Sequence, residues 1–452
     1  MKNTQNFTEG KIFAPLIRFA LPVLFALFLQ TMYGAVDLLV VGRFGTAADV
    51  SAVSTGSMIM HTITVVVTGL AMGLTVFVAR KIGAGLKQEA GKIIGSGIWL
   101  FAIISVAITA VMVFAAPLTA RVMNAPKAAF DKTVTYIVIC SIGTLFIIAY
   151  NLVGSIFRGI GDSKMPLVTV AIACVLNIAG DLILVALLHM GTAGAAIATV
   201  FAQAVSVLLS LLIIRKRELP FSFSVKDIRP KGAYIKELLK LGVPIALQDL
   251  LVSISFLVIT AIVNALGLTA SAGVGVAEKM CGFLMLVSSA YMQSMSAFVA
   301  QNIGAQKPAR ARKALFCGII SSLAVGVVMG YFTFFHGDLL AGIFAKDADV
   351  ILAAADYLKA YAFDCLLTSF LFCFIGYFNG CSSTTFVMLQ GIIGAFGVRV
   401  PVSWFMSRQA NVSLFRIGLA TPASTVIQII LCGIYFAVLL RRQRADHANC
   451  AL

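Results

Sequence analysis

The chain has 452 residues, of which 60% are hydrophobic and only 12% are charged, and its mean hydropathy is +1.01. A water-soluble domain of this composition would aggregate, so the numbers exclude soluble enzymes and binding modules and indicate a membrane protein. The net charge of +16 does not require nucleic acid, because basic loops set membrane topology and attract anionic lipid headgroups.

Twelve apolar stretches follow one another along the chain, each long enough to cross about 30 Å of hydrocarbon as a helix. Six lie in the first half, at residues 14–43, 51–79, 93–117, 133–157, 165–188 and 191–214. Six lie in the second half, at residues 237–267, 269–300, 314–335, 353–378, 384–407 and 417–440. The alternating pattern of a membrane barrel does not appear, so we predict an all-α membrane protein with twelve transmembrane helices.

The two halves of the sequence resemble each other. Residues 77–84 read FVARKIGA and residues 298–305 read FVAQNIGA, at a separation of 221 residues. Six helices in each copy imply two pseudo-symmetric six-helix lobes around a central cleft, a design found in secondary transporters. The predicted parts are an N-terminal lobe, a cytoplasmic linker, a C-terminal lobe and a cytoplasmic tail, at residues 1–214, 215–236, 237–440 and 441–452.

The basic residues predict the orientation. With the N-terminus in the cytoplasm, 24 of the 34 Lys and Arg residues fall on the cytoplasmic side, 8 on the opposite side and 2 inside crossings. We therefore expect a multi-pass protein of the inner (plasma) membrane with both termini in the cytoplasm. The nine Cys residues lie singly, without a Cys-x-x-Cys pair, so neither disulfides nor bound zinc are expected.

Five acidic residues lie inside the apolar stretches, where a charge is costly and commonly functional. They are Asp37, Asp181, Asp249, Glu278 and Asp364. Asp37 and Asp181, together with Asn177 and Thr199, lie at similar depth, roughly 10–15 Å below the outer surface at 1.5 Å per residue. The four can converge if the first, fifth and sixth helices pack together.

Such a set of oxygen atoms suits a hard cation such as Na⁺, and two carboxylates in a low-dielectric site can equally share a proton. The sequence does not choose between Na⁺ and H⁺. The corresponding residues of the second half fall on or next to Ile259, Val398, Val402 and Ala420, which are apolar. This asymmetry favours a function over a purely structural role, the alternative being that Asn177 and Asp181 only bond neighbouring helices.

In the second half, Asp249 lies in the seventh crossing, and Glu278, Asp364 and Arg399 lie at comparable depth in later crossings. Two interpretations stay open for them: a buried ion-pair network, or a role in binding a cation or the substrate.

The residues resemble the multidrug and toxic compound extrusion (MATE) family, from about Leu16 to Leu440. The resemblance is carried by Pro22 and by residues 36–42, 158–166, 177–181 and 194–199, which read VDLLVVG, RGIGDSKMP, NIAGD and GAAIAT. It implies that Asp37, Asn177, Asp181 and Thr199 form the coupling-cation site. It also implies that protonation of Asp37 accompanies bending at Pro22, and that Gln30 and Tyr136 line the cavity of the N-terminal lobe. Several members carry an acid where this chain has Ser253.

The function implied is export of organic, amphipathic or cationic solutes in exchange for Na⁺ or H⁺, by alternating access of the two lobes. No enzyme activity, cofactor or nucleic acid is expected; the partners are a small-molecule substrate and the lipid bilayer, and the protein is expected to be a monomer. One alternative is a flippase for lipid-linked intermediates of the same superfamily, although only Lys279 and Arg399 are basic within crossings. A membrane enzyme is the remote alternative, since no catalytic motif is present.

Overall fold

The computed structural model describes residues 7–216, 219, 221 and 223–449. In this part of the chain every regular element is a helix, because lipid offers no partners for backbone N–H and C=O groups. Eleven helices are long and apolar enough to cross a membrane, and a bent pair makes twelve. The prediction of twelve transmembrane helices is therefore confirmed. Residues 1–6, parts of the predicted linker (217, 218, 220 and 222) and residues 450–452 lie outside the described residues.

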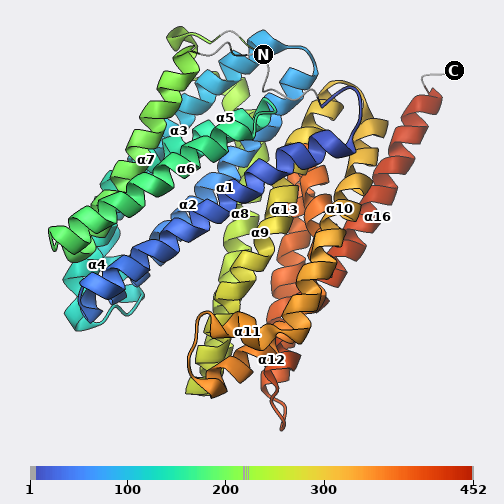
Figure 1. Cartoon of the computed structure of the whole chain (residues 1–452). Helices are drawn as coiled ribbons and strands as arrows, with labels where there is room; N and C mark the ends of the chain where they lie inside the picture. The colour runs from blue at the N-terminus through green and yellow to red at the C-terminus, as the bar shows by residue number, and fades with distance from the viewer. Residues whose placement is uncertain (1–6, 217–218, 220, 222, 450–452) are drawn as a thin grey trace. The chain divides into compact units, whose positions relative to one another are not determined.

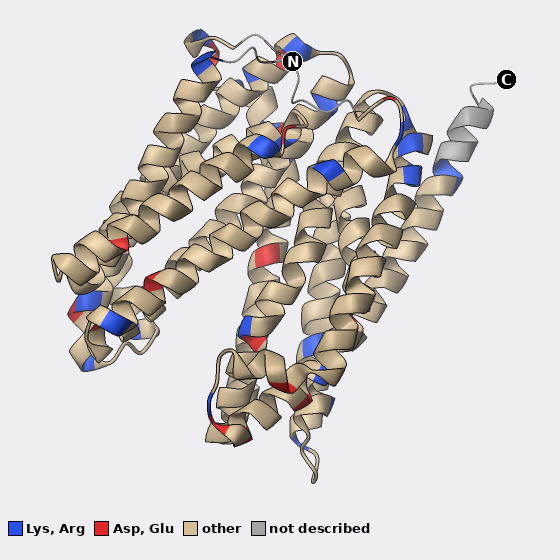
Figure 2. Ribbon diagram, viewed as in Figure 1, with Lys and Arg blue, Asp and Glu red and all other residues tan. Residues whose placement is uncertain are grey.

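The helices follow the predicted apolar stretches closely (Figure 1). The first half contains α1 (Phe13–Phe44), α2 (Ala47–Gly83), α3 (Lys87–Val122), η1 (Lys127–Ala129), α4 (Phe130–Ile142), α5 (Thr144–Gly159), α6 (Lys164–Asp181), η2 (Leu182–Leu187), α7 (Gly191–Lys216) and η3 (Val225–Asp227). The second half contains α8 (Gly232–Asn264), α9 (Leu268–Gly304), α10 (Pro308–Phe335), α11 (Gly337–Gly342), α12 (Ala348–Gly380), α13 (Thr384–Ile392), η4 (Ile393–Arg399), α14 (Val400–Ser407), α15 (Leu414–Gly418) and α16 (Ala420–Asn449). Charged residues gather mainly at helix ends in both halves (Figure 2).

The chain forms two compact units. Unit 1 comprises Met1–Ala246 and Ser296–Ala311, and unit 2 comprises Leu247–Met295 and Arg312–Leu452. These units divide α8 and α9, whereas the lobes predicted from the sequence keep both helices whole. Close backbone approaches explain why one end of each helix belongs to unit 1: a Cβ on Gly73 would meet the backbone of Gly242 of α8, and one on Gly83 would collide with the backbone of Gln301 of α9.

Three irregularities interrupt the helices. The crossing predicted at residues 133–157 is bent by 52° between α4 and α5. The fifth crossing ends in the π-helical segment η2, directly after Asp181, and the eleventh contains the π-helical segment η4. A π-helical turn takes in one residue more than an α-helical turn, because its hydrogen bonds join residues i and i+5.

At the end of unit 1 nearest the predicted site, the carboxylate of Asp49 joins three helices. Thr46 caps α2 and forms a reciprocal capping box with Asp49. One oxygen of Asp49 also accepts a 2.8 Å hydrogen bond from the hydroxyl of Thr192 on α7 and pairs with Lys132 on α4 at 2.9 Å. This carboxylate therefore connects three helices beside the turn that follows α1.

Candidate functional site

The predicted cation site is built from three packed helices of unit 1. Helix α1 packs against α6, and α6 packs against α7. Asp37 lies on α1 and Thr199 lies on α7, while α6 supplies Asn177 and Asp181. Asn177 and Asp181 are four residues apart, so they project from the same face of their helix.

The side chains of all four predicted residues meet. The hydroxyl of Thr199 donates a 3.2 Å hydrogen bond to Oδ2 of Asp37. The amide of Asn177 donates a 3.3 Å hydrogen bond to the same hydroxyl. The carboxyl groups of Asp37 and Asp181 are neighbours and interact electrostatically. The helix packing that the sequence prediction required is therefore present.

The site is buried and rich in unsatisfied oxygen atoms. Asp37 is 5% exposed, Asn177 1% and Asp181 0%. Among the described residues, Oδ1 of Asp37, Oδ1 of Asn177 and both carboxylate oxygens of Asp181 have no hydrogen-bond partner. Buried acceptors without donors are costly, and two neighbouring carboxylates repel each other. A proton or a hard cation would relieve both costs.

Two polar residues that the sequence analysis did not single out extend the cluster. The amide of Gln203 donates a 3.4 Å hydrogen bond to the hydroxyl of Tyr33, and Tyr33 interacts electrostatically with Asp37. Tyr33 lies four residues before Asp37, and Gln203 lies four residues after Thr199. This i, i+4 spacing on two helices was the signal that could have identified them.

The remaining predicted residues of unit 1 lie on the same elements. Pro22 lies inside the continuous helix α1. Gln30 is half-buried on α1, seven residues before Asp37 and so on the same face. Tyr136 is buried on α4, in the apolar cluster that includes Val40 and Val41 of α1, and its ring lies against Gly56 of α2.

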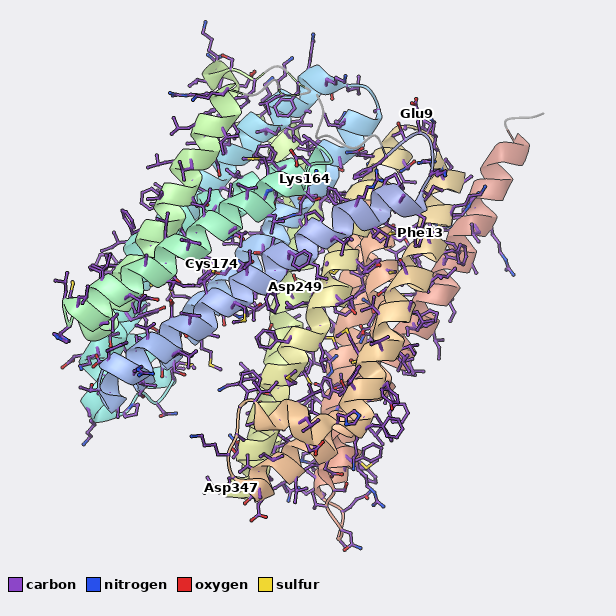
Figure 3. The ribbon with its side chains drawn as sticks, in the orientation of Figure 1. Glu9, Phe13, Lys164, Cys174, Asp249 and Asp347 are labelled. Atoms are coloured by element: carbon purple, nitrogen blue, oxygen red, sulfur yellow. The ribbon has the colours of Figure 1, made fainter. Side chains whose placement is uncertain are left out.

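Two of the acids predicted in unit 2 accept hydrogen bonds from threonine hydroxyl groups. The hydroxyl of Thr260 donates to both oxygens of Glu278, at 3.1 and 3.3 Å. Asp364 accepts a 2.6 Å hydrogen bond from the hydroxyl of Thr425. Asp249, labelled in Figure 3, is half-buried on α8. No direct ion pair joins the acids of unit 2 to Arg399 among the described residues.

The structure corrects the register that the sequence comparison gave to the eleventh crossing. That comparison placed the counterparts of Asn177 and Asp181 on or next to the apolar residues Val398 and Val402. The buried residues of this segment are instead Arg399, which is 5% exposed, and Ser403, which is 0% exposed. The π-helical segment η4 takes in one extra residue and shifts the register by one.

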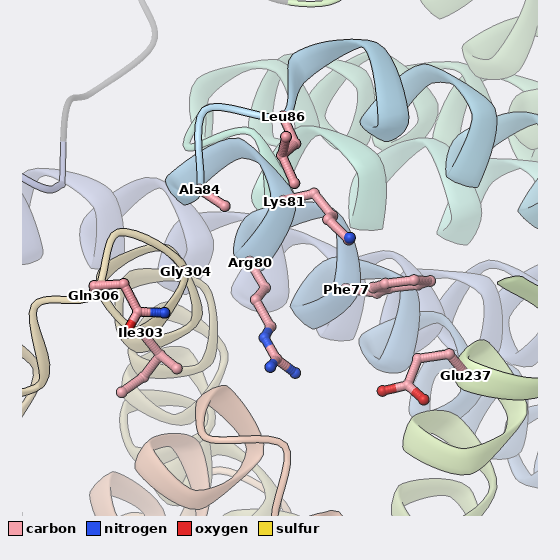
Figure 4. A pocket seen from close by; sticks show the side chains of 9 residues that line it. All are labelled: Phe77, Arg80, Lys81, Ala84, Leu86, Glu237, Ile303, Gly304 and Gln306. Carbon is pink, nitrogen blue, oxygen red and sulfur yellow. The ribbon is translucent and has the colours of Figure 1, made fainter. Parts of the chain in front are cut away.

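A separate cavity of about 380 Å³ lies in unit 1, among the ends of α2, α8 and α9. Figure 4 shows Arg80 and Glu237 extending into it from α2 and α8, and Gln306 beside the end of α9. Nearby, Lys81 forms a 2.6 Å ion pair with Glu89. The cavity shares no lining residue with the Asp37 cluster.

Comparison with known proteins shows which family this chain resembles. A family model described as MatE matches residues 22–183 and again residues 244–405. The chain is 26% identical over 403 residues to the probable multidrug resistance protein YpnP of Bacillus subtilis, covering 89% of this chain and 90% of that protein. It is 23% identical over 399 residues to the multidrug export protein MepA of Staphylococcus saprophyticus, covering 87% and 88%.

The fold is also similar to that of a MATE protein crystallised in complex with MaL6. The TM-score is 0.91 at 20% sequence identity, with 97% of this chain and 98% of that chain covered. The two matches to the family model confirm that the halves are repeats and together span most of the crossings. The chain therefore belongs to the MATE family of multidrug efflux transporters and is a transporter rather than an enzyme.

Proposed function

We propose that this chain is a secondary antiporter that exports amphipathic or cationic organic solutes in exchange for Na⁺ or H⁺. The observation that carries the proposal is the cluster of Asp37, Asn177, Asp181 and Thr199, in which several buried oxygen atoms have no partner among the described residues. Intramembrane acids that face one another rather than lipid are typical of ion pathways. Export of drugs is supported by relatives such as MepA, which is named as a multidrug export protein.

Loading of the site supplies the driving force in this proposal. Without a bound cation, two carboxylates share a water-poor space and repel each other. A sodium ion or a proton removes part of that repulsion, so the loaded and empty sites favour different packings of α1 against α6. A ligand can drive a conformational cycle only through such a difference in affinity between two states.

The other predicted residues have supporting roles. Pro22 lies fifteen residues before Asp37 on the same helix, and its ring removes a backbone hydrogen bond, so α1 can bend there when Asp37 is neutralised. We place Gln30 and Tyr136 along the solute path in the N-terminal lobe. Asp249 and Glu278 are placed along the path in the C-terminal lobe, where acids would attract a cationic solute.

The proposed lobes are residues 1–214 and 237–440, which alternate in exposing the path to the two sides of the plasma membrane. The excess of Lys and Arg in one set of loops supports cytoplasmic termini. A single chain contains a complete set of proposed site residues, which supports a monomeric transporter.

The test is efflux of a fluorescent cationic dye from cells that lack other dye exporters, with Na⁺ and H⁺ gradients imposed separately. We compare the wild type with Asp37→Asn and with Asp131→Asn. Asp131 is an exposed acid on α4, so its replacement controls for loss of one negative charge. We expect efflux under one of the two gradients, abolished in Asp37→Asn and retained in Asp131→Asn.

Each result has a defined meaning. The gradient that drives efflux identifies the coupling ion. Full activity of Asp37→Asn would show that the coupling site is misplaced. A wild type that moves no dye under either gradient would count against drug export and favour a lipid-linked substrate instead.

A further inference from the structure

The segment that connects α7 to α8 is attached to the start of α3. A Cβ on Gly95 of α3 would collide with the backbone carbonyl of Asp227 in η3. The hydroxyl of the next residue, Ser96, donates a 3.0 Å hydrogen bond to the carbonyl of Arg229. Earlier in the segment, Phe221 is buried in the apolar cluster that includes the first turns of α3. The segment therefore has a defined position against one helix of unit 1.

These contacts place the segment at the edge of the hydrocarbon layer. The apolar stretch predicted for the third crossing begins at residue 93, so Gly95 and Ser96 lie within its first helical turn. Only 11% of the apolar window of α3 is buried inside the protein, so most of this helix faces lipid. Residues 223–231, which lie against α3 at this level, therefore meet the boundary between acyl chains and headgroups.

Residues 223–231 expose apolar and basic side chains together. Val225 is 79% exposed, whereas Phe221, four residues earlier, is 8% exposed. The acid of the segment, Asp227, accepts a 2.9 Å hydrogen bond from the backbone N–H of Ser224 in the capping box that closes η3. The exposed apolar residues are Phe223 and Val225, and the exposed bases are Lys226, Arg229 and Lys231.

We propose that residues 223–231 are a docking surface for anionic phospholipids of the adjacent leaflet. Phe223 and Val225 enter the layer between headgroups and acyl chains, and the three bases meet the lipid phosphates. Apolar side chains next to bases at a membrane surface bind anionic lipid through both terms, the buried apolar area and the charge.

The attachment to α3 distinguishes this proposal from a role in topology alone. Setting the topology requires the positive charges, but it requires neither the exposed Val225 nor the contacts of Gly95 and Ser96. A lipid is the occupant that fits, because the surface lies beside the bilayer and offers contacts to both parts of a phospholipid. The proposal does not depend on the coupling ion or on the exported solute.

The test measures which lipids lie next to residue 225. The two native tryptophans, Trp99 and Trp404, are replaced by Phe, and Val225→Trp supplies the reporter. The full chain is reconstituted into phosphatidylcholine vesicles that contain an equal minor fraction of either phosphatidylglycerol or phosphatidylcholine with brominated acyl chains. Bromine quenches tryptophan fluorescence only at close range, so the two quenching efficiencies compare the lipids beside the reporter.

We expect both brominated lipids to quench the reporter, and phosphatidylglycerol to quench it about twofold or more as strongly as phosphatidylcholine. The preference should disappear in the triple variant Lys226→Gln, Arg229→Gln, Lys231→Gln. The matched control removes three exposed bases outside the segment and should keep the preference. Its substitutions are Lys313→Gln, Arg441→Gln and Arg442→Gln. All six bases are exposed, so neither triple variant disturbs a buried contact.

Three results would overturn the proposal. An unquenched reporter would mean that residue 225 lies in water, away from the bilayer. Equal quenching by the two lipids would show contact with the bilayer without selection for the anionic headgroup. Loss of the preference in the control variant as well would make it an effect of net charge rather than of residues 223–231. None of these results bears on the Asp37 cluster, which the efflux measurement tests.

Discussion

The hydroxyl of Thr199 decides how the oxygen atoms of the unit 1 site are arranged. Its hydrogen is committed to Asp37 and its lone pair accepts from the amide of Asn177. The amide group of Asn177 is thereby turned toward Thr199, and its carbonyl oxygen stays without a donor among the described residues. One hydroxyl therefore orients two of the three other residues and leaves their free oxygens for a cation.

Replacing Thr199 by Val should weaken cation loading without changing the volume of the site. Removal of the hydroxyl takes one oxygen ligand from the loaded site and removes the contact that orients Asp37, and a polar contact to a charged group contributes about 1.5–3 kcal/mol. Since 1.4 kcal/mol is a factor of ten in affinity, the ion concentration that gives half-maximal dye efflux should rise about tenfold or more. Thr199→Ser keeps the hydroxyl and should stay close to the wild type; equal effects of Val and Ser would argue against this role.

At the scale of helices, the two copies of the repeated sequence, residues 77–84 and 298–305, contact each other. A Cβ on Gly83 would collide with the carbonyl of Gln301, and a Cβ on Gly304 would collide with the carbonyl of Arg80. Gly83 lies three residues after Arg80, which Gly304 approaches, and Gly304 lies three residues after Gln301, which Gly83 approaches. The ends of α2 and α9 therefore cross within unit 1 in a nearly symmetric way, and only glycine permits this distance.

Gly83→Ala and Gly304→Ala should each destabilise the protein, while Gly42→Ala should not. All three changes raise intrinsic helix propensity by about 1 kcal/mol, but a Cβ on Gly42 meets nothing within 4 Å. Overpacking at the crossing should cost about 1–3 kcal/mol. The measurement is the temperature at which half of the detergent-purified protein is lost from its gel-filtration peak. Equal midpoints for all three variants would mean that the crossing adjusts freely.

The existence of the crossings could be predicted from the sequence because hydrophobicity and backbone satisfaction leave only helices in lipid. The bend and the π-helical segments within the crossings could not be predicted in this way. The bend between α4 and α5 lies at Gly143, where a Cβ would collide with the side chain of Val200 on α7, so it depends on tertiary packing. The segments η2 and η4 are local changes of hydrogen bonding that hydropathy does not register.

The site was predictable in part for a similar reason. Counting residues from the helix ends gave the depth of Asp37, Asn177, Asp181 and Thr199, and depth was sufficient to suggest that they meet. Which helices pack together is a tertiary property that was assumed. Tyr33 and Gln203 were missed because uncharged polar residues in a membrane helix commonly serve as interhelical hydrogen bonders.

At the scale of the whole molecule, the segment before α1 connects parts of the chain that are about 300 residues apart in sequence. Phe7 is 0% exposed and packs against Phe19 and Phe298, with ring centres 5.1 and 4.8 Å away. The guanidinium of Arg310 donates hydrogen bonds to four backbone carbonyls, those of Phe7, Glu9, Gly10 and Lys11. Figure 3 labels Glu9 and Phe13 in this region. The contacts lie within unit 1, and hydropathy gave no sign of them.

Arg310→Ala should release this segment while leaving the helices folded. Four carbonyl groups lose their donor, but the segment is close to water, which can replace the lost hydrogen bonds, so the global stability should change little. The measurement is the rate at which trypsin cuts after Lys11 in the purified protein, followed by the appearance of a chain that begins at Ile12. We expect at least a tenfold increase, because the protease needs this backbone in an extended, unattached state.

Lys313→Ala is the matched control for Arg310→Ala, since it removes an exposed positive charge one turn further along the same helix. It should be cut at the rate of the wild type. If Arg310→Ala were also cut at that rate, the packing of Phe7 against Phe19 and Phe298 would be sufficient to hold the segment, and Phe7→Ala should then increase cleavage. These variants therefore distinguish whether the burial of Phe7 or the hydrogen bonds of Arg310 hold residues 7–11 against residues 298–310.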